Sequence, residues 1–271
     1  MRQYRTDPEG WLPSPKKGGE RTHRAQMALG VAPPSLDQSR RTDSGMGESP
    51  GREPQKKHRE VIGMKYLCAN WQGFLQMIVY LCSRGYNFYC LTLFPVKKKQ
   101  KWEAVDKKLI ERYRCNLSKF QKARKKKKGV ANFAYLRWEN HSLIMHTKGI
   151  IEVKVEDQFK DVKKIPILIR VSDNIEIKVY NDDGKYTCRL SKDSYRGLKS
   201  VLWDIAKTKN LTKIKKEWDK LNGLPTYSGI LEQKKLLRKY LVKQARKHQV
   251  KLSESDLRLN TRRKIYKVWE N

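Results

Sequence analysis

A run of cations is the part of this 271-residue sequence best suited to chemistry. Six of the seven residues from 122 to 128 are Lys or Arg, and Gly129 ends the run. Such side chains neutralise phosphates, which gives affinity for nucleic acid and positions it without reading its sequence. A solvated basic loop or a localisation-type signal is the alternative interpretation. The residues predicted to contact phosphate are Lys122, Arg124, Lys125, Lys126, Lys127 and Lys128.

A second basic surface is predicted on a helix from about 229 to 249. Leu237, Tyr240 and Leu241 form its apolar side. A basic amphipathic helix can also bind an anionic membrane or a calmodulin-like partner. We favour nucleic acid, because the first run has no amphipathic helical pattern. The cations predicted on the other side are Lys234, Lys235, Arg238, Lys239, Lys243, Arg246 and Lys247.

Aromatic residues alternate along a predicted strand beside the first basic run. Phe133, Tyr135 and Arg137 share one face of this strand, whereas Leu136 and Trp138 share the other. Aromatic side chains beside cations stack the bases of single-stranded RNA or DNA. We therefore expect Tyr135 and Arg137 to form an exposed platform, although core packing is the common role of such aromatics.

His141 and His146 are the weak catalytic candidates. Five residues apart on a strand, they lie on opposite faces, which argues against a shared metal or an acid and base pair. Either could act alone as a general acid or base in RNA cleavage. Carboxylates show no spacing diagnostic of a two-metal nuclease, and we expect no metal and no cofactor.

The net charge of the chain is +33, from 61 basic and 28 acidic residues. Such an imbalance is tolerable when a polyanion such as nucleic acid neutralises it. The best apolar stretch, residues 64–82, contains five polar or small interruptions, so we expect no membrane span. The N-terminus has no secretory signal. Five cysteines without a CxxC pair indicate buried free thiols in the cytoplasm or an organelle stroma or matrix.

Residues 1–63 differ in composition from the rest. They hold seven of the ten prolines, and Arg outnumbers Lys eight to four, whereas 36 Lys accompany 13 Arg from Met64 onward. Segments this poor in apolar periodicity are typically disordered. The segment is either a disordered basic tail or an upstream extension of the reading frame, in which case Met64 is the start.

The elements that must position these residues begin after Met64. We expect a helix capped by Asn70, a central strand at 86–94, a helix from Trp102, and a hairpin of 131–138 and 141–147. Residues 149–164 are ambiguous. Three short strands near 166–171, 174–180 and 185–190 follow, then helices capped by Ser191 or Asp193, by Thr212, and the helix at 229–249.

This order predicts the α+β class, with a mixed or antiparallel sheet and packed helices. Ferredoxin-like and replication-initiator-like folds both fit. We expect a core at 64–210, a basic helical segment at 211–271 and a disordered extension at 1–63.

The strand end Leu91-Thr92-Leu93-Phe94, followed by a helix and a hairpin, resembles the start of rolling-circle replication initiators over about 60 residues. In that family the second hairpin strand carries two histidines flanking one hydrophobic residue, which bind the metal. This chain has His141-Ser-Leu-Ile-Met-His146, so the metal pair is absent. The resemblance implies a related, inactive or divergent fold.

The sequence thus predicts a non-enzymatic nucleic-acid-binding protein of a mobile element, plasmid or organelle genome. RNA or single-stranded DNA is favoured, because no helix-turn-helix pair is evident around Gly223-Leu-Pro225. Two alternatives stay open. One is a metal-independent ribonuclease or a replication-type nickase with a Tyr nucleophile. The other is a ribosome-associated structural protein.

Overall fold

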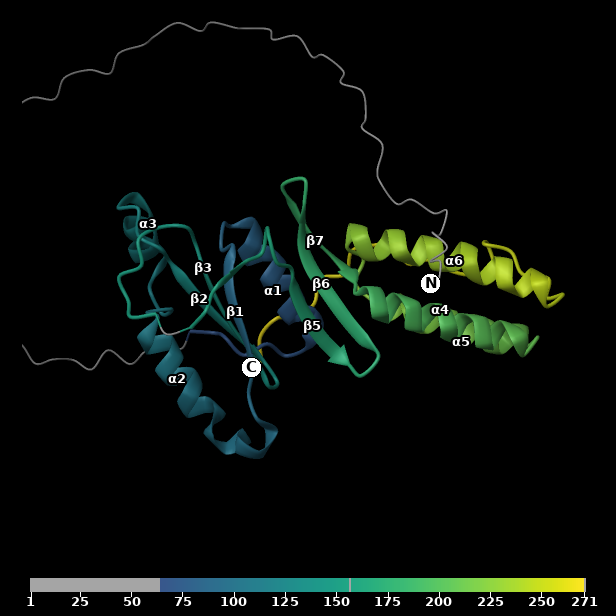
Figure 1. The fold of residues 1–271 in the computed structure, drawn as a ribbon, viewed down its shortest axis with the longest axis horizontal. Coiled ribbons are helices and arrows are strands. Elements are labelled where there is room, and N and C mark those ends of the chain that lie inside the picture. The colour runs from purple at the N-terminus through teal and green to yellow at the C-terminus, as the bar shows by residue number, and fades with distance from the viewer. Residues whose placement is uncertain (1–63, 156, 271) are drawn as a thin grey trace, which may run out of the picture. The chain divides into compact units, whose positions relative to one another are not determined.

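The computed structural model describes residues 64–155 and 157–270 of the chain. The described residues form an α+β fold, as predicted, and their strands are divided between two antiparallel sheets (Figure 1). The expected disorder of residues 1–63, and the interpretation of Met64 as the start, lie outside the described residues. Among the described helices, none has the length and apolar character needed to cross a bilayer.

Helix α1 (Trp71–Ser83) begins where the sequence predicts. The side chain of Asn70 caps it by accepting a hydrogen bond from the backbone N–H of Gly73 at 2.7 Å. This cap satisfies one of the backbone donors that a helix leaves free at its N-terminus. The apolar residues spaced three and four apart, among them Phe74 and Ile78, are fully buried.

The first sheet contains four strands in the order β2-β3-β1-β4. The predicted hairpin is confirmed, with Trp138 opposite His141 and a left-handed φ of 46° at Glu139 in the turn. The bounds are β1 (Phe88–Leu93), β2 (Phe133–Trp138), β3 (His141–His146) and β4 (Lys160–Asp161).

Strand β1 is central in the sheet, as expected, but only its first half has a neighbouring strand on both sides. The short strand β4 pairs with Phe88 and Tyr89 alone, and the other end of β1 leaves Leu93 exposed. The strand buried along its whole length is β3, which pairs with both β1 and β2.

Helices cover both faces of this sheet. On one face, Phe74 of α1 packs near Trp138. On the other, Ile110 of α2 (Trp102–Arg112) and Tyr113 belong to a second buried cluster with Phe133. The short 3-10 helix η1 (Val96–Lys101) precedes α2, and α3 (Lys119–Lys127) follows it.

The second sheet is a three-stranded meander of β5 (Ile167–Ser172), β6 (Ile175–Asp182) and β7 (Lys185–Leu190). All three strands were predicted. Asp183 and Gly184 form the tight turn between β6 and β7 with φ values of 45° and 84°. This is the conformation that Asp-Gly favours in a two-residue hairpin.

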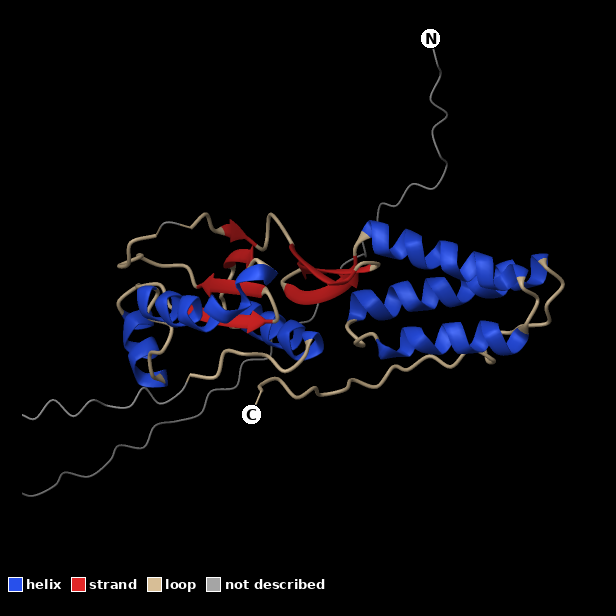
Figure 2. Ribbon diagram, turned by 90° about the horizontal axis from the view of Figure 1, so that it is seen from below, coloured by secondary structure: helices blue, strands red, loops and turns tan. Residues whose placement is uncertain are grey.

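Three helices follow: α4 (Lys192–Lys207), α5 (Leu211–Lys220) and α6 (Ser228–Lys247), with a 3-10 turn η2 (Leu221–Gly223) after α5 (Figure 2). Ser191 caps α4 as predicted. The predicted cap of α5, Thr212, is wrong, because the side chain of Asn210 accepts from Lys213 and starts the helix earlier. Trp218 and Leu237 belong to the same buried cluster as residues of α1 and β6. The expected division between a core at 64–210 and a C-terminal segment at 211–271 stays a prediction.

The chain is not helical to its end. After α6, residues 251–270, here called the C-terminal strap, run without helix back to the start of α1. Ala69 N–H donates to Val268 O at 2.8 Å, and Glu270 N–H donates to Leu67 O at 3.1 Å. A Cβ on Gly73 would lie 2.7 Å from Lys267 O, so only glycine lets the strap approach α1 this closely.

The cysteines are free thiols, as predicted. Four are buried and Cys90 is half-buried. Burial raises the pKa of Cys68, Cys82 and Cys115 to about 12. At neutral pH these thiols are protonated, so they serve as small apolar core groups rather than nucleophiles.

Candidate nucleic-acid interface

The first basic run forms most of helix α3. Ser118 and Gln121 make a capping box at its start: the Ser118 side chain accepts from Gln121 N–H, and the Gln121 side chain accepts from Ser118 N–H. Gly129, with φ of 70°, ends the helix, and Val130 N–H donates to Lys125 O. The cations of the last turn face free carbonyls, which favours positive charge there.

Helix α3 is fixed against the hairpin by one side chain. The amide of Asn132, just before β2, donates to Lys122 O at 3.0 Å. Asn132 is itself held in place, because its backbone N–H donates to Thr147 Oγ1 at 3.0 Å, just beyond the end of β3. The run therefore lies beside the rim of the sheet, where the sequence places it.

The cations of α3 are not equally available. Lys122 is half-buried, and burial lowers the pKa of its amine. Lys125 forms an ion pair with Glu152 at 3.4 Å, which ties α3 to the segment after β3. Among the described residues this is the only ion pair recorded for α3. The exposed cations are Lys119, Arg124, Lys126, Lys127 and Lys128.

A shallow cavity of about 290 Å³ lies along one side of α3. Arg124, Lys125 and Lys128 line it together with Arg114, which comes from the turn after α2. Its apolar part is Leu117 and Val130. Sequence reasoning missed Arg114, because nothing in the local pattern shows that the turn after α2 folds back on α3. Four cations against one carboxylate give this cavity the charge that would favour an anion such as phosphate.

Helix α6 carries five of the seven cations predicted for the second surface as exposed side chains. Lys235, Lys239, Lys243, Arg246 and Lys247 are exposed, and most are spaced four apart, so they follow one stripe of the helix. Arg238 is instead paired with Glu254 at 2.8 Å.

Lys234 is wrongly placed on that surface, since its side chain is 0% exposed. It lies in line with Ile230, Leu237 and Leu241, which are four, three and seven residues away on the apolar side. Its amine donates to Asn222 Oδ1 at 3.2 Å, and burial lowers its pKa. The α3 and α6 surfaces are separate: α3 is fixed to the hairpin, whereas α6 packs on β7 and α4 (Figure 1).

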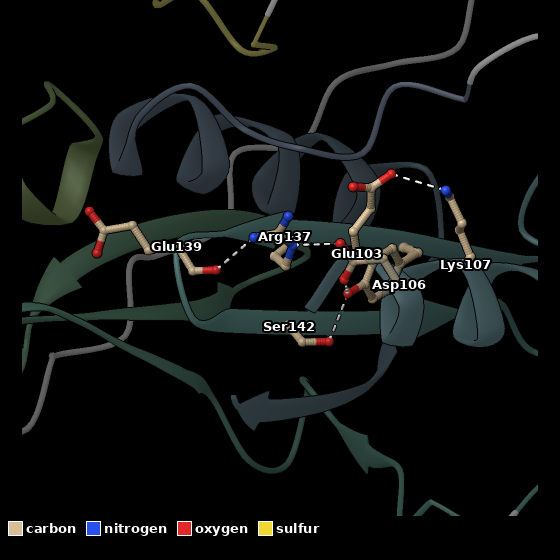
Figure 3. A network of polar contacts seen from close by, with 7 residues as sticks. Glu103, Asp106, Lys107, Arg137, Glu139 and Ser142 are labelled. Carbon is tan, nitrogen blue, oxygen red and sulfur yellow. Dashed lines mark hydrogen bonds and ion pairs between the residues drawn. The ribbon is translucent and has the colours of Figure 1, made fainter. Parts of the chain in front are cut away.

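The predicted platform of Tyr135 and Arg137 is wrong. Both residues do share one face of β2, but α2 covers that face, leaving Tyr135 2% and Arg137 9% exposed. Their polar atoms converge on the fully buried carboxylate of Asp106 (Figure 3). Neither side chain is available to a base, so neither is part of the candidate interface.

Asp106 holds this network together. Tyr135 Oη donates to Asp106 Oδ1 at 2.5 Å, and Arg137 Nε donates to Asp106 Oδ2 at 2.7 Å. Ser142 Oγ donates to Tyr135 Oη at 3.1 Å. Burial, and then the charge of Asp106, raise the pKa of Tyr135, so its hydroxyl stays protonated and is a poor nucleophile.

A cavity of about 630 Å³ adjoins the network, lined in part by Trp102, Arg137 and Lys99. Two carboxylates, Glu139 and Glu270, line it as well. They repel phosphate and offset the two cations. The cavity beside α3 is therefore the better anion site.

The two histidines lie on opposite faces of β3, as predicted. His141 stacks on Trp138 at a ring distance of 5.0 Å, and His146 stacks on Phe88 at 4.8 Å. Both are buried, and burial lowers the pKa of each imidazole. Neutral histidines enclosed by aromatic rings on separate faces form no joint catalytic site.

These buried histidines predict a stability that depends on pH. Because each folded-state pKa lies below the unfolded value of 6.5, the unfolded chain binds more protons below that pH. The free energy of unfolding is expected to fall on acidification below about pH 6.5, by up to about 1.4 kcal/mol per pH unit for each histidine. Urea unfolding at several pH values measures this, and His146→Phe should flatten the slope. An unchanged slope in that variant would contradict the assignment to His146.

No protein-family model, no curated protein and no solved structure matches this chain. Within residues 64–155 and 157–270, no group of three or more His, Cys, Asp or Glu side chains is arranged to hold a metal ion.

Proposed function

We propose that this protein binds nucleic acid through its phosphates, with helix α3 and Arg114 as the main contact surface. The observation that carries the proposal is the concentration of exposed cations on α3 without carboxylate partners. Helix α3 and its C-cap residue Lys128 carry five exposed Lys or Arg side chains, and of the cations in this run only Lys125 has an ion pair recorded in the described part of the chain. Arg114 adds a further cation from a separate element.

The energetics of α3 favour a polyanionic partner. Like charges three or four residues apart on a helix destabilise it, and the cations from 119 to 128 include six pairs at this spacing. A phosphate backbone relieves this repulsion and releases condensed counterions, which drives binding. A small anion could fill the cavity, but it would leave Lys119 and Lys126 unneutralised.

The stripe of exposed cations on α6 supports a second, separate contact. Its five cations extend along about three turns of helix, a length suited to following a backbone. We therefore treat RNA or single-stranded DNA as the proposed ligand, bound without base-specific contacts at α6. The free thiols suit a reducing compartment, and we propose the cytoplasm or an organelle stroma or matrix.

The salt dependence of binding tests the proposal. Purified protein is titrated with a labelled single-stranded oligodeoxythymidine at a series of salt concentrations. If α3 and Arg114 neutralise about five or six phosphates, log K should fall with log salt with a slope of about −3.5 to −4. Absence of binding at low salt, or a slope near zero, would refute the proposal.

A further inference from the structure

Phe120 is the most exposed aromatic residue among those the structure describes, at 77% of its full accessible area. The other exposed aromatic side chains are each accompanied by a cation from the next helical turn. Arg84 lies over Tyr80, and Lys207 lies over Trp203 at 3.0 Å from the ring centroid. For Phe120 no ring contact is recorded within the described residues.

The fold gives no reason for phenylalanine at this position. Phe is a poorer helix former than Ala or Lys, and an exposed ring gains nothing from burial. Helix α3 has no buried residue at all, so Phe120 does not help to anchor it. Single exposed apolar side chains are normal on a protein surface, so exposure alone assigns no role to Phe120.

The position of Phe120 on the helix indicates the partner. Residues three, four and seven positions apart lie on one face, so Phe120 shares a ridge with Arg124 and Lys127. Arg124 also lines the cavity that Arg114 and Lys128 surround. An aromatic ring one helical turn from a cation that lines such a cavity can stack a base while phosphates on either side meet cations.

We propose that Phe120 is a base-stacking residue for single-stranded nucleic acid. The inference deepens the proposed function: it assigns the preference for single strands to α3 instead of the buried Tyr135. The ring stacks on one unpaired base, and Arg124, Lys127 and the cavity cations hold the neighbouring phosphates. Paired bases in a duplex keep their faces covered by their neighbours, so a duplex offers this ring nothing to stack on.

Two oligonucleotides separate stacking from phosphate contact. One is a single-stranded oligodeoxythymidine, and the other is an abasic strand of equal length, which keeps the phosphates and lacks the bases. Phe120→Ala should weaken binding of the first strand by roughly 5- to 150-fold, the range that loss of one stacked base produces. Binding of the abasic strand should not change. Phe120→Tyr should retain the parent affinity, because it keeps the ring.

Two controls make the result specific. Trp203→Ala removes an exposed aromatic side chain from α4 and should leave both affinities unchanged. Phe120→Ala is not expected to disturb the fold, because the side chain is exposed and Ala favours helix. If Phe120→Ala binds both strands like the parent, or weakens both equally, stacking at Phe120 is wrong while the phosphate interface stands. If the parent binds neither strand, both proposals are wrong.

Discussion

Replacing Asp106 by Ala is expected to lower the free energy of unfolding by about 3–5 kcal/mol, the usual result of breaking a buried ion pair from one side. The variant leaves the guanidinium of Arg137 buried without its carboxylate partner. It also removes the acceptor of the Tyr135 hydroxyl. The loss follows from unpaired buried groups more than from the missing attraction itself.

Urea unfolding followed by circular dichroism measures this effect, and helix α2 provides a matched control. Glu103, three residues before Asp106 on the same helix, pairs with Lys107 at 3.0 Å in solvent. Glu103→Ala should cost less than about 1 kcal/mol, because exposed pairs are weak. Similar losses in the two variants would show that Asp106 is not the centre of the network.

The second large effect is expected from neutralising the end of α3. The triple variant Lys126→Gln, Lys127→Gln and Lys128→Gln removes three exposed cations and keeps the Lys125 ion pair with Glu152. If each contacts a phosphate, the salt slope should become shallower by about 2 units. In an assay at about 0.15 M salt, the affinity for a single strand should fall by about 50-fold.

A second triple variant tests whether position matters or only net charge. Lys192→Gln, Lys213→Gln and Lys216→Gln removes the same charge from exposed positions in α4 and α5. Charges farther than about 10 Å from the ligand are largely screened at this salt, so a much smaller change is expected. Equal losses in the two triple variants would place the interface elsewhere than α3.

Local signals were sufficient for most of the fold. Asn70 before an apolar stripe located α1, and the Asn-Asp-Asp-Gly turn located β6 and β7. In these cases the hydrogen bonds that decide the conformation form between residues close in sequence. The start of α5 was missed by two residues, because both Asn210 and Thr212 are good caps.

The candidate interface depended more on tertiary structure. The alternation along β2 correctly predicted that Tyr135 and Arg137 share one face of the strand. It could not predict whether that face is exposed to solvent or covered by a helix. It is covered because Asp106, on a helix about 30 residues earlier, neutralises Arg137 there. Phe120 could have been noticed, since it is the one aromatic residue in a helix that is otherwise mostly cationic.

The C-terminal strap has a consequence for folding during synthesis. Leu67 and Ala69 form backbone hydrogen bonds with Glu270 and Val268, so the segment that begins α1 finds these partners about two hundred residues further along the chain. A ribosome releases the N-terminal part first, and the surface around Gly73 stays uncovered while those residues emerge. Closing so long a loop is slow relative to local helix formation. On the ribosome, the strap is therefore expected to close over α1 only after both sheets are complete.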